Sequence, residues 1–192
     1  MTTEDVSVTP IGATAFTWAA PRLLTVYEAA MAPPPDQLPA REAVMRHHAT
    51  LAGFHAVVAH EPGSPDASDA VAFAYGFPGR PGQWWHDIVT AEVAQRDPAA
   101  LRPWFGSVFE IAEVHVRPEW QGRGLGRSML SRLTTSRTEA TAALSTRPGP
   151  TPARRLYHSF GFVDLLPRFF FPGAPDQPFA VMVSRLPLRS TS

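Results

Sequence analysis

Residues 110–133 hold the pattern with the clearest chemical meaning, because a run of apolar and β-branched residues leads there into a cluster of glycines. The segment Gln121–Arg127 reads Q-G-R-G-L-G-R and opens a helix predicted over 122–137. The first amides of a helix lack intrahelical acceptors and carry the positive end of the helix dipole. Glycines let a bulky anion approach those amides, and Arg123 and Arg127 add positive charge there. The segment is therefore predicted to hold a phosphate group.

The spacing of these glycines excludes two common phosphate-binding motifs. A P-loop needs Gly-Lys followed by Ser or Thr, and the chain contains no lysine. A dinucleotide fingerprint needs G-x-G-x-x-G in the first strand–helix unit, whereas Gly122, Gly124 and Gly126 form G-x-G-x-G beyond the middle of the chain. Glycines also serve tight turns, so the cluster alone leaves a purely structural role open.

The strand predicted at 107–116 carries the candidate groups for acid–base chemistry. Its two-residue period places Glu110 in a row that is otherwise apolar, with Val108, Ala112, Val114 and Val116. Burial of a carboxyl group in such a row raises its pKa toward values useful for a general base. The alternative is a structural glutamate paired with a buried arginine.

Glu113 and His115 share the other face of this strand, which makes them weaker candidates. A strand bulge would reverse the phase, so Glu113 is kept as the second candidate for the base. His115 is predicted to be a packed or half-exposed residue. His47 and His48 have no third ligand at metal spacing and are predicted to lie on a solvated helix face, so no metal site is expected.

Two segments of the chain resemble a known family. Residues 114–126 read V-x-V-x-P-x-x-Q-G-R-G-L-G and resemble the acetyl-CoA signature Q/R-x-x-G-x-G/A of the GNAT superfamily of N-acetyltransferases. Residues 153–162 read A-R-R-L-Y-H-S-F-G-F and resemble the family segment A-x-x-L-Y-x-x-x-G-F. The order of the predicted elements is also similar to that of the family from about residue 11 to 186.

The resemblance implies acetyl-CoA as the acyl-donor cosubstrate. It implies that the backbone of Val114, His115 and Val116 holds the pantetheine arm and the thioester carbonyl. The pyrophosphate would be wrapped by the glycine-rich segment, which consists of Gln121, Gly122, Arg123, Gly124, Leu125, Gly126 and Arg127. The strand at 140–146 would splay away and leave a cleft in which the thioester meets the amine.

The resemblance also implies two catalytic residues. Glu110 matches a position at which several family members keep a catalytic glutamate, and Tyr157 matches the position that donates a proton to the leaving sulfur. A core tyrosine is the alternative for Tyr157. Pro150 departs from the family, which often has Asn there, so the hydrogen bond of that Asn to the cofactor arm must be absent or replaced, for example by Thr151.

These residues lead to a specific expectation, an N-acetyltransferase acting by direct attack within a ternary complex. Glu110 would accept the amine proton through water, and Tyr157 would reprotonate the thiolate. The acceptor would be a small-molecule amine or a protein amino group, and the sequence does not choose between them. Two alternatives remain: a CoA-binding sensor or interaction domain without turnover, and a nucleic-acid surface in the arginine-rich second part.

The elements that must position these residues alternate along the chain. The hairpin of 54–60 and 70–77 is predicted to be antiparallel, and the segment from 107 to 165 to contain a parallel crossover. The fold class is α/β, with a mixed, mostly antiparallel central sheet flanked by helices. Further strands are predicted at 11–18, 140–146, 162–171 and 179–186, and helices at 22–31, from about 39 to 51, 88–95, 122–137 and 152–160.

Two aromatic clusters have no assigned role. Trp84 and Trp85 lie in a stretch predicted to be mostly irregular, 78–106, and Phe169–Phe171 precedes the last turn. Either cluster caps the core or lines an acceptor pocket, and core packing is favoured for the tryptophans because tryptophan is usually well buried.

Composition sets the outer limits. The 192 residues, 44% hydrophobic and 18% charged, fit a single domain at 10–186 with tails at 1–9 and 187–192. Zero net charge argues against a dedicated nucleic-acid or anionic-membrane binder, although residues 1–100 carry 5 arginines and 11 acids and the remainder 12 and 6. The chain has no cysteine, no apolar run near the ~20 residues of a membrane span, and an acidic, polar start, which predicts a cytoplasmic protein. A homodimer is left open.

Overall fold

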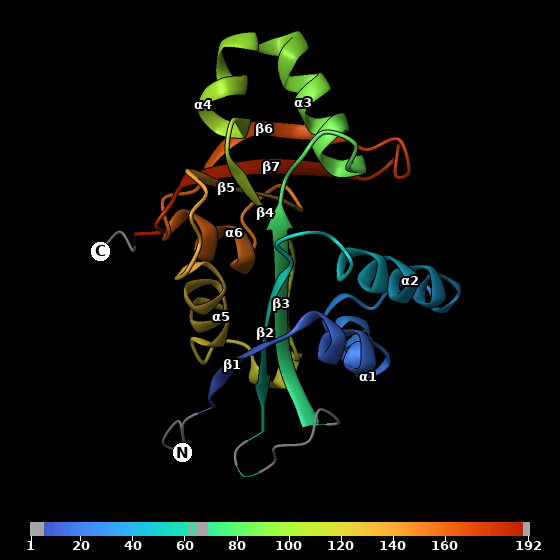
Figure 1. The fold of residues 1–192 in the computed structure, drawn as a ribbon. Coiled ribbons are helices and arrows are strands. Elements are labelled where there is room, and N and C mark those ends of the chain that lie inside the picture. Colours follow the sequence, from blue (N-terminus) through green and yellow to red (C-terminus); the bar gives the residue numbers. More distant parts are fainter. Residues whose placement is uncertain (1–5, 62, 64–68, 190–192) are drawn as a thin grey trace. The chain divides into compact units, whose positions relative to one another are not determined.

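The computed structural model describes residues 6–61, 63 and 69–189 (Figure 1). Seven strands form one hydrogen-bonded sheet in the order β1-β2-β3-β4-β5-β7-β6. The chain divides into two compact units: Met1–Phe77 with Ala112–Leu133, and Pro78–Ile111 with Thr134–Ser192. Apart from the parallel β4–β5 pair, the strand pairs whose registers are known are antiparallel. The predicted fold class, a mixed and mostly antiparallel sheet flanked by helices, is confirmed.

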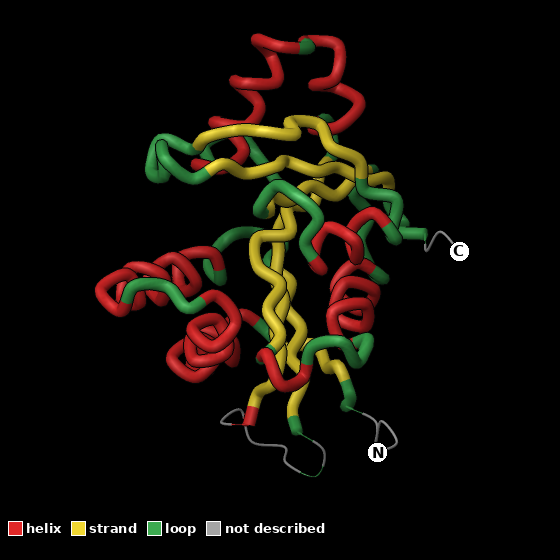
Figure 2. The backbone as a smooth tube through the Cα atoms, turned by 180° about the vertical axis from the view of Figure 1, so that it is seen from behind, coloured by secondary structure: helices red, strands yellow, loops and turns green. Residues whose placement is uncertain are grey.

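The first unit packs helices on both faces of its strands. α1 and α2 lie on one face and α5 lies on the other (Figures 1 and 2). β1 pairs with β2, and β2 pairs with β3, both in antiparallel orientation. The β2–β3 pair is the predicted antiparallel hairpin. The elements of this unit are β1 (Val8–Ile11), α1 (Ala13–Met31), η1 (Pro35–Gln37), α2 (Leu38–His48), β2 (His55–His60), β3 (Ala70–Pro78), the second half of β4 (Val108–Val116), η4 (Pro118–Trp120) and α5 (Leu125–Thr134).

The strand predicted at 11–18 is wrong beyond its first residue. β1 ends at Ile11, and α1 occupies Ala13–Met31, so the helix predicted at 22–31 begins much earlier. Phe16, Ala20 and Leu23 are fully buried at helical spacing, and this burial outweighs the local preference for a strand. β1 begins at Val8, inside the segment that composition assigns to a tail.

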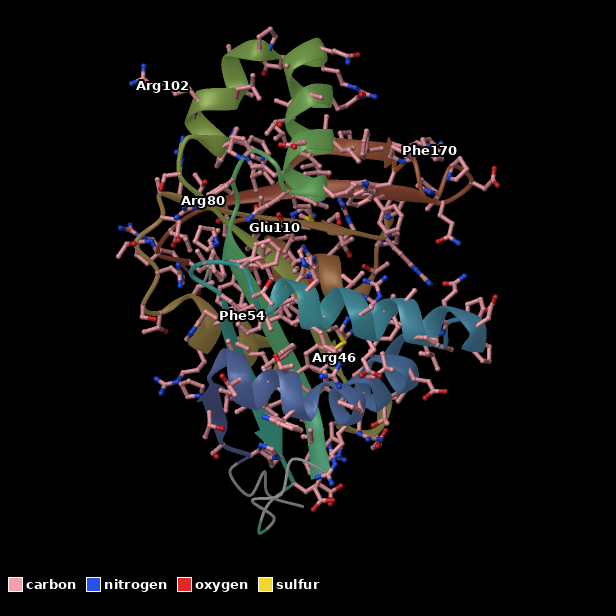
Figure 3. The ribbon with its side chains drawn as sticks, turned by 45° about the vertical axis from the view of Figure 1, so that its right-hand side comes forward. Arg46, Phe54, Arg80, Arg102, Glu110 and Phe170 are labelled. Carbon is pink, nitrogen blue, oxygen red and sulfur yellow. The ribbon has the colours of Figure 1, made fainter. Side chains whose placement is uncertain are left out.

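Pro21 lies inside α1 and explains why the early part of this helix was missed. Proline has no N–H, so it leaves the carbonyl four residues before it, that of Thr17, without its usual helical donor. Arg46 of α2 supplies a donor instead, because its Nη1 lies 2.8 Å from the Thr17 carbonyl oxygen. Figure 3 shows Arg46 on α2. The same guanidinium is held by Glu42 at 2.8 Å, so a proline that should weaken α1 becomes a point of attachment to α2.

The second unit is organised around the parallel crossover. β4 and β5 are parallel, with Val108, Phe109 and Glu110 opposite Thr141, Ala142 and Ala143, which confirms the predicted crossover. α3 and α4 lie on one side of β6 and β7, and α6 on the other (Figure 1). The remaining elements are α3 (Trp84–Arg96), η3 (Pro98–Ala100), α4 (Leu101–Phe105), β5 (Thr141–Thr146), α6 (Pro152–His158), β6 (Val163–Phe170) and β7 (Pro178–Arg185).

The stretch 78–106 is more ordered than predicted. The short helix expected at 88–95 begins at Trp84, and a further helical turn is formed by α4. Val89 and Val93 of α3 are buried in one cluster with Val108 and Ala143 of the sheet, so this segment is part of the core. Apolar and polar residues alternate around α3 without one clear apolar side, which hid the helical period.

Arg46 is expected to stabilise the first unit through the carbonyl that Pro21 leaves without a donor. Replacing Arg46 with Met keeps much of the aliphatic stem but removes the donor, and should lower the free energy of unfolding by about 1 kcal/mol. Replacing Pro21 with Ala restores a helical donor to the Thr17 carbonyl. A double-mutant cycle measured by urea unfolding should therefore show that Arg46→Met costs less when residue 21 is alanine. Equal costs in both backgrounds would contradict this account.

Candidate functional site

The end of β4 is held firmly before the chain turns toward α5. The backbone N–H of Arg117 donates to the Val71 carbonyl at 2.9 Å, and its Nε donates to the Ala70 carbonyl at 3.0 Å. Its Nη2 also donates to Thr25 Oγ1 at 2.9 Å. One arginine thus ties the last residues of β4 to β3 and to α1, and fixes the strand that is predicted to hold the pantetheine arm.

The glycine-rich turn after η4 has the backbone geometry of an open cradle. Gly122 and Gly124 have φ values of 76° and 79°, a conformation that residues with a side chain rarely adopt. A Cβ added at either position would meet no atom within 4 Å, so the space above this backbone is open. Gln121 folds back, and its Nε2 donates to the Val116 carbonyl at 3.0 Å. A bulky anion could therefore approach the amides at the start of α5 closely.

α5 presents this turn because only one of its sides is buried. Leu125, Met129, Leu130 and Leu133 are buried, as their spacing predicts, whereas Gly124 is exposed. Arg123 adds a positive charge at the cradle, with its guanidinium 4.8 Å from the centre of the Trp120 ring. Helix dipole, open amides and arginine together provide the features that bind a pyrophosphate.

Glu110, labelled in Figure 3, carries a buried carboxyl group on β4. The residue is 4% exposed, and its Oε2 has no hydrogen-bond partner among the described residues. Loss of hydration upon burial raises the pKa of this carboxyl to about 8. The alternative of a glutamate paired with a buried arginine is therefore not what the described residues show, and the carboxyl group is poised to exchange a proton near neutral pH.

Glu113 lies three residues further along the same strand in the opposite electrostatic situation. Burial alone would raise the pKa of its carboxyl, but His115 and Arg41 outweigh that effect and lower it. Arg41 Nη1 lies 2.8 Å from Glu113 Oε1, and His115 Nε2 forms a short hydrogen bond with Glu113 Oε2. The carboxylate of Glu113 thus accepts hydrogen bonds at both oxygens and is held in its ionised form. Its lowered pKa makes it a poor proton acceptor.

The surroundings of Glu113 come from elements far away in the chain. Arg41 of α2 also packs over the ring of Tyr27 of α1, with 5.0 Å between its Cζ and the ring centre, and the ring of Tyr27 meets that of His115 edge-on at 5.1 Å. His115 is 8% exposed, as expected for a packed residue. No local sequence signal identified Arg41, since its partner lies 72 residues away.

His48 does not lie on a solvated face, contrary to the prediction from the sequence. It is half-buried, and its Nδ1 lies 3.1 Å from the hydroxyl oxygen of Tyr75. Burial lowers the pKa of its imidazole to about 4, so His48 is neutral at pH 7. Among the residues that the structure describes, no group of three or more His, Cys, Asp or Glu side chains could hold a metal ion.

Tyr157 is carried by α6 and is 8% exposed. Its backbone carbonyl accepts hydrogen bonds from the amides of Phe160 at 2.9 Å and Phe162 at 3.1 Å, which closes the helix as predicted for the glycine at 161. Arg154, one turn earlier, forms two 2.7 Å hydrogen bonds with the carboxylate of Asp164 on β6. Tyr157 therefore stands on a short helix whose position is fixed at both ends.

The start of α6 contains Pro150, at the position where the family often has Asn, and Thr151, its possible replacement. Thr151 is the N-cap of α6, where its Oγ1 accepts a hydrogen bond from the Arg154 amide at 3.1 Å. The carbonyl of Pro150 accepts a hydrogen bond from Arg155 Nη1 at 3.0 Å. The hydroxyl oxygen of Thr151 is thus already used in capping, although its hydrogen can still be donated.

The predicted site residues divide between the two compact units. Glu110 and Tyr157 belong to the unit that contains β5, β6 and β7, whereas residues 114–116 and 121–127 belong to the other. Glu110 and Val114 are nonetheless parts of one uninterrupted strand, β4. In the part of the chain that the structure describes, no helix is long and apolar enough to span a bilayer.

Comparison with known proteins agrees with this geometry. The profile of the acetyltransferase (GNAT) domain matches residues 68–164, half of the chain. A GCN5-like protein acetyltransferase of Mycobacterium tuberculosis is 34% identical over 187 residues, covering 86% of this chain and 90% of that protein.

Solved structures show the same fold at low sequence identity. The ribosomal-protein-S18-alanine N-acetyltransferase of Escherichia coli superposes with a TM-score of 0.60 at 16% identity, covering 97% of each chain. A Salmonella typhimurium protein solved with its cofactor acetyl-CoA has a TM-score of 0.61 at 18% identity and covers 98% of each chain. With the matching profile and the curated relative, these likenesses show that the chain belongs to the GNAT family of acetyl-CoA-dependent acetyltransferases.

Proposed function

We propose that this enzyme transfers the acetyl group of acetyl-CoA directly to a primary amine held beside it. The observation that carries the proposal is the buried carboxyl of Glu110, whose Oε2 has no hydrogen-bond partner within the described part of the chain and whose pKa burial raises to about 8. An alkylammonium must lose a proton before it can attack a thioester, and a base with a pKa near the working pH is suited to take it. Acetyl-CoA supplies the activated acetyl group.

The donor-binding groups proposed here are those of the cradle. The backbone of Val114, His115 and Val116 would hold the pantetheine arm, and the segment Gln121–Arg127 would wrap the pyrophosphate. Two observations support this assignment: the open space above Gly122 and Gly124, and the arginine at the start of α5. Oxygen atoms of a diphosphate are suited to amides at a helix N-terminus and to guanidinium groups.

Three proton transfers complete the proposed reaction. Glu110 accepts the first proton of the ammonium through water, so that the amine nitrogen can bond to the acetyl carbon as the carbon–sulfur bond breaks. The hydroxyl of Tyr157 gives its proton to the departing thiolate, whose basicity is close to that of a phenol, and the second proton of the amine nitrogen returns to the Tyr157 oxygen as the amide forms. The bonds that fix α6 and Tyr157 support this role, because a general acid must be held in one geometry.

For the acceptor, we favour a protein amino group over a free small-molecule amine. The 34% identical relative is named a protein acetyltransferase, and its match covers most of both chains. A cytoplasmic location accords with such an acceptor.

The alternative function is a CoA-binding domain without turnover. Pro150 supports it, because the family often has Asn at this position. A free-thiol release assay with acetyl-CoA and a panel of peptides and amines separates the two: release supports the enzyme, and tight CoA binding without release supports the alternative.

Replacing Glu110 with Gln should lower kcat by at least about a hundredfold, because general-base catalysis contributes about 10²–10⁴ to rate. In the wild type, kcat/KM should rise with pH and level off above about 8, where Glu110 is ionised. This rise of kcat/KM with pH, the limb of the profile below about pH 8, should be absent in the variant. A Glu110→Gln enzyme with wild-type rate and pH profile would contradict the assignment.

Replacing Glu110 should also change how the free energy of unfolding depends on pH, which can be measured without catalysis. The folded pKa lies above the unfolded value of 4.5, so ionisation of Glu110 disfavours folding, and stability falls as pH rises toward about 8. Glu110→Gln should lose this fall and become more stable than the wild type at high pH. The matched control is Glu113→Gln, which should lose about 2 kcal/mol of stability by weakening the pair with Arg41 while keeping the kcat/KM limb.

Replacing Gly124 with Ala should weaken binding of CoA roughly tenfold or more, because the added methyl group projects into the open cradle and the left-handed backbone is strained. Gly82→Ala is the matched control, since its φ of 91° carries the same strain with equally open surroundings. Titration calorimetry should show weaker CoA binding only for the first variant. Equal affinity in both would remove the cradle from the proposed site.

Replacing Tyr157 with Phe should leave acetyl-CoA binding intact and slow CoA release by about a hundredfold to ten-thousandfold, since a general acid is lost. Tyr75→Phe is the control, because it removes a buried hydroxyl that bonds to His48 instead. Stopped-flow detection of free thiol should place the defect in kcat, with KM for acetyl-CoA unchanged. Similar defects in both variants would point to a structural effect.

A further inference from the structure

The first turn of α3 carries a large aromatic surface that the proposed chemistry does not use. Trp84 is 59% exposed, although one face of its indole stacks on Phe171 with ring centres 5.5 Å apart and planes 28° from parallel. Phe171 follows the last residue of β6 and is itself buried. It is braced edge-on by Phe169 at 4.8 Å and by Phe179 at 5.3 Å. The indole therefore rests on a rigid support and shows its other face to solvent.

The neighbouring Trp85 ties this turn to β5 at a defined place. Its indole Nε1–H donates to Ser145 Oγ at 3.2 Å. Ser145 lies two residues beyond Ala143, which is paired with Glu110 at the last position of the β4–β5 register. Side chains alternate along a strand, so the side chains of Glu110, Ala143 and Ser145 share one face of the sheet.

That face is the one that α3 covers. Val108, two residues before Glu110 on the same face, is buried in one cluster with Ala143 and with Val89 and Val93 of α3. The helix thus packs on the face of the sheet to which the side chain of Glu110 also points, and Trp85 of its first turn meets β5 at Ser145. An amine that gives its proton to Glu110 must bring the rest of its molecule to this same face.

The first turn of α3 offers an apolar surface beside a carboxylate. Asp87 accepts from the backbone amide of Gly82, at 3.1 and 3.0 Å to its two oxygens, and its side chain stays 52% exposed. The indole nitrogen of Trp85 donates to Ser145. The open face of Trp84 offers apolar and π contact to a ligand.

We propose that the exposed face of Trp84, supported by Phe171, is an acceptor subsite that binds an apolar side chain next to the reactive amine. This inference rests on the proposed function, because it takes Glu110 as the group that receives the amine proton. A peptide acceptor would place its lysine toward Glu110 and an adjacent leucine or similar residue against the indole. Burial of the apolar group against the indole would favour that acceptor over a polar one.

The test uses two acceptor peptides that differ only beside the lysine, with leucine in one and serine in the other. The wild-type enzyme should prefer the leucine peptide by about tenfold in kcat/KM, as is usual for one apolar contact. Trp84→Ala should abolish the preference by raising KM for the leucine peptide, with kcat and KM for acetyl-CoA unchanged. Trp84→Phe should restore most of it, because a flat apolar face is kept.

Two controls separate this surface from exposed aromatics in general. Phe170 is 41% exposed and lies between the buried Phe169 and Phe171, so it points to the opposite face of β6; Figure 3 shows it at the end of that strand. Trp18 is 81% exposed on α1. Phe170→Ala and Trp18→Ala should keep the preference for leucine. A preference that survives in Trp84→Ala, or disappears equally in Phe170→Ala, overturns the proposal.

Calorimetric titration of the CoA-bound protein with the leucine peptide tests the subsite without turnover. If the wild type releases no CoA with any peptide, the proposed acetyl transfer fails. The subsite still stands in that case if Trp84→Ala weakens peptide binding about tenfold. If turnover is normal and Trp84→Ala changes neither peptide binding nor the preference, the subsite fails and the proposed function stands. Trp84→Gln provides a second truncation should the alanine variant not fold.

Discussion

The buried carboxyl group of Glu110 is the constraint on which the rest of β4 depends. Ionising Glu110 inside the fold costs free energy, because burial removes water and, among the described residues, Oε2 has no hydrogen-bond partner to replace it. A sequence under pressure for stability alone would place an apolar residue there, as it does at Val108 two positions earlier. The surrounding core must offset this cost, and the gain is a carboxyl group able to hold or release a proton near pH 8.

Glu110 and Glu113 lie close together on β4, but their carboxyl groups have different electrostatic environments. Three residues beyond Glu110, Glu113 has Arg41 and His115 as partners and a lowered pKa. The partners of Glu113 come from α2 and β4, whereas Glu110 is paired with Ala143 of β5 at the end of the parallel register. One strand therefore carries a carboxylate with a lowered pKa that fastens it to α2 and, three residues earlier, a carboxyl group with a raised pKa. Such divergence between neighbouring titratable groups is a mark of functional sites.

The sequence predicted local patterns well and long-range partners not at all. The glycine turn, the buried side of α5, the parallel crossover and the cap at Thr151 follow from signals within a few residues, and all are present. The start of α1 was missed because Pro21 breaks the helical pattern, and the missing donor comes from Arg46 on the next α-helix, α2. Arg41 likewise becomes part of the site only through tertiary contact. Glu110 was a candidate from the strand period as well as from resemblance, and its predicted burial is present, whereas the role of Tyr157 came from resemblance alone.

The donor side and the acceptor side of this enzyme obey different physical demands. A diphosphate needs amides and positive charge in a fixed pattern, which is why a short, recognisable glycine segment can provide it. An acceptor subsite needs only shape and apolar surface, and many residue types can supply these. Such a surface can discriminate between acceptors only if it is rigid. When a mobile side chain binds a ligand, the conformational entropy that it loses offsets the free energy gained from the contact. Trp84 meets that demand through Phe171, whose own ring is held by Phe169 and Phe179. A stack of this kind has no sequence signature beyond scattered aromatics, so selectivity in this chain is carried by the elements that sequence patterns describe least.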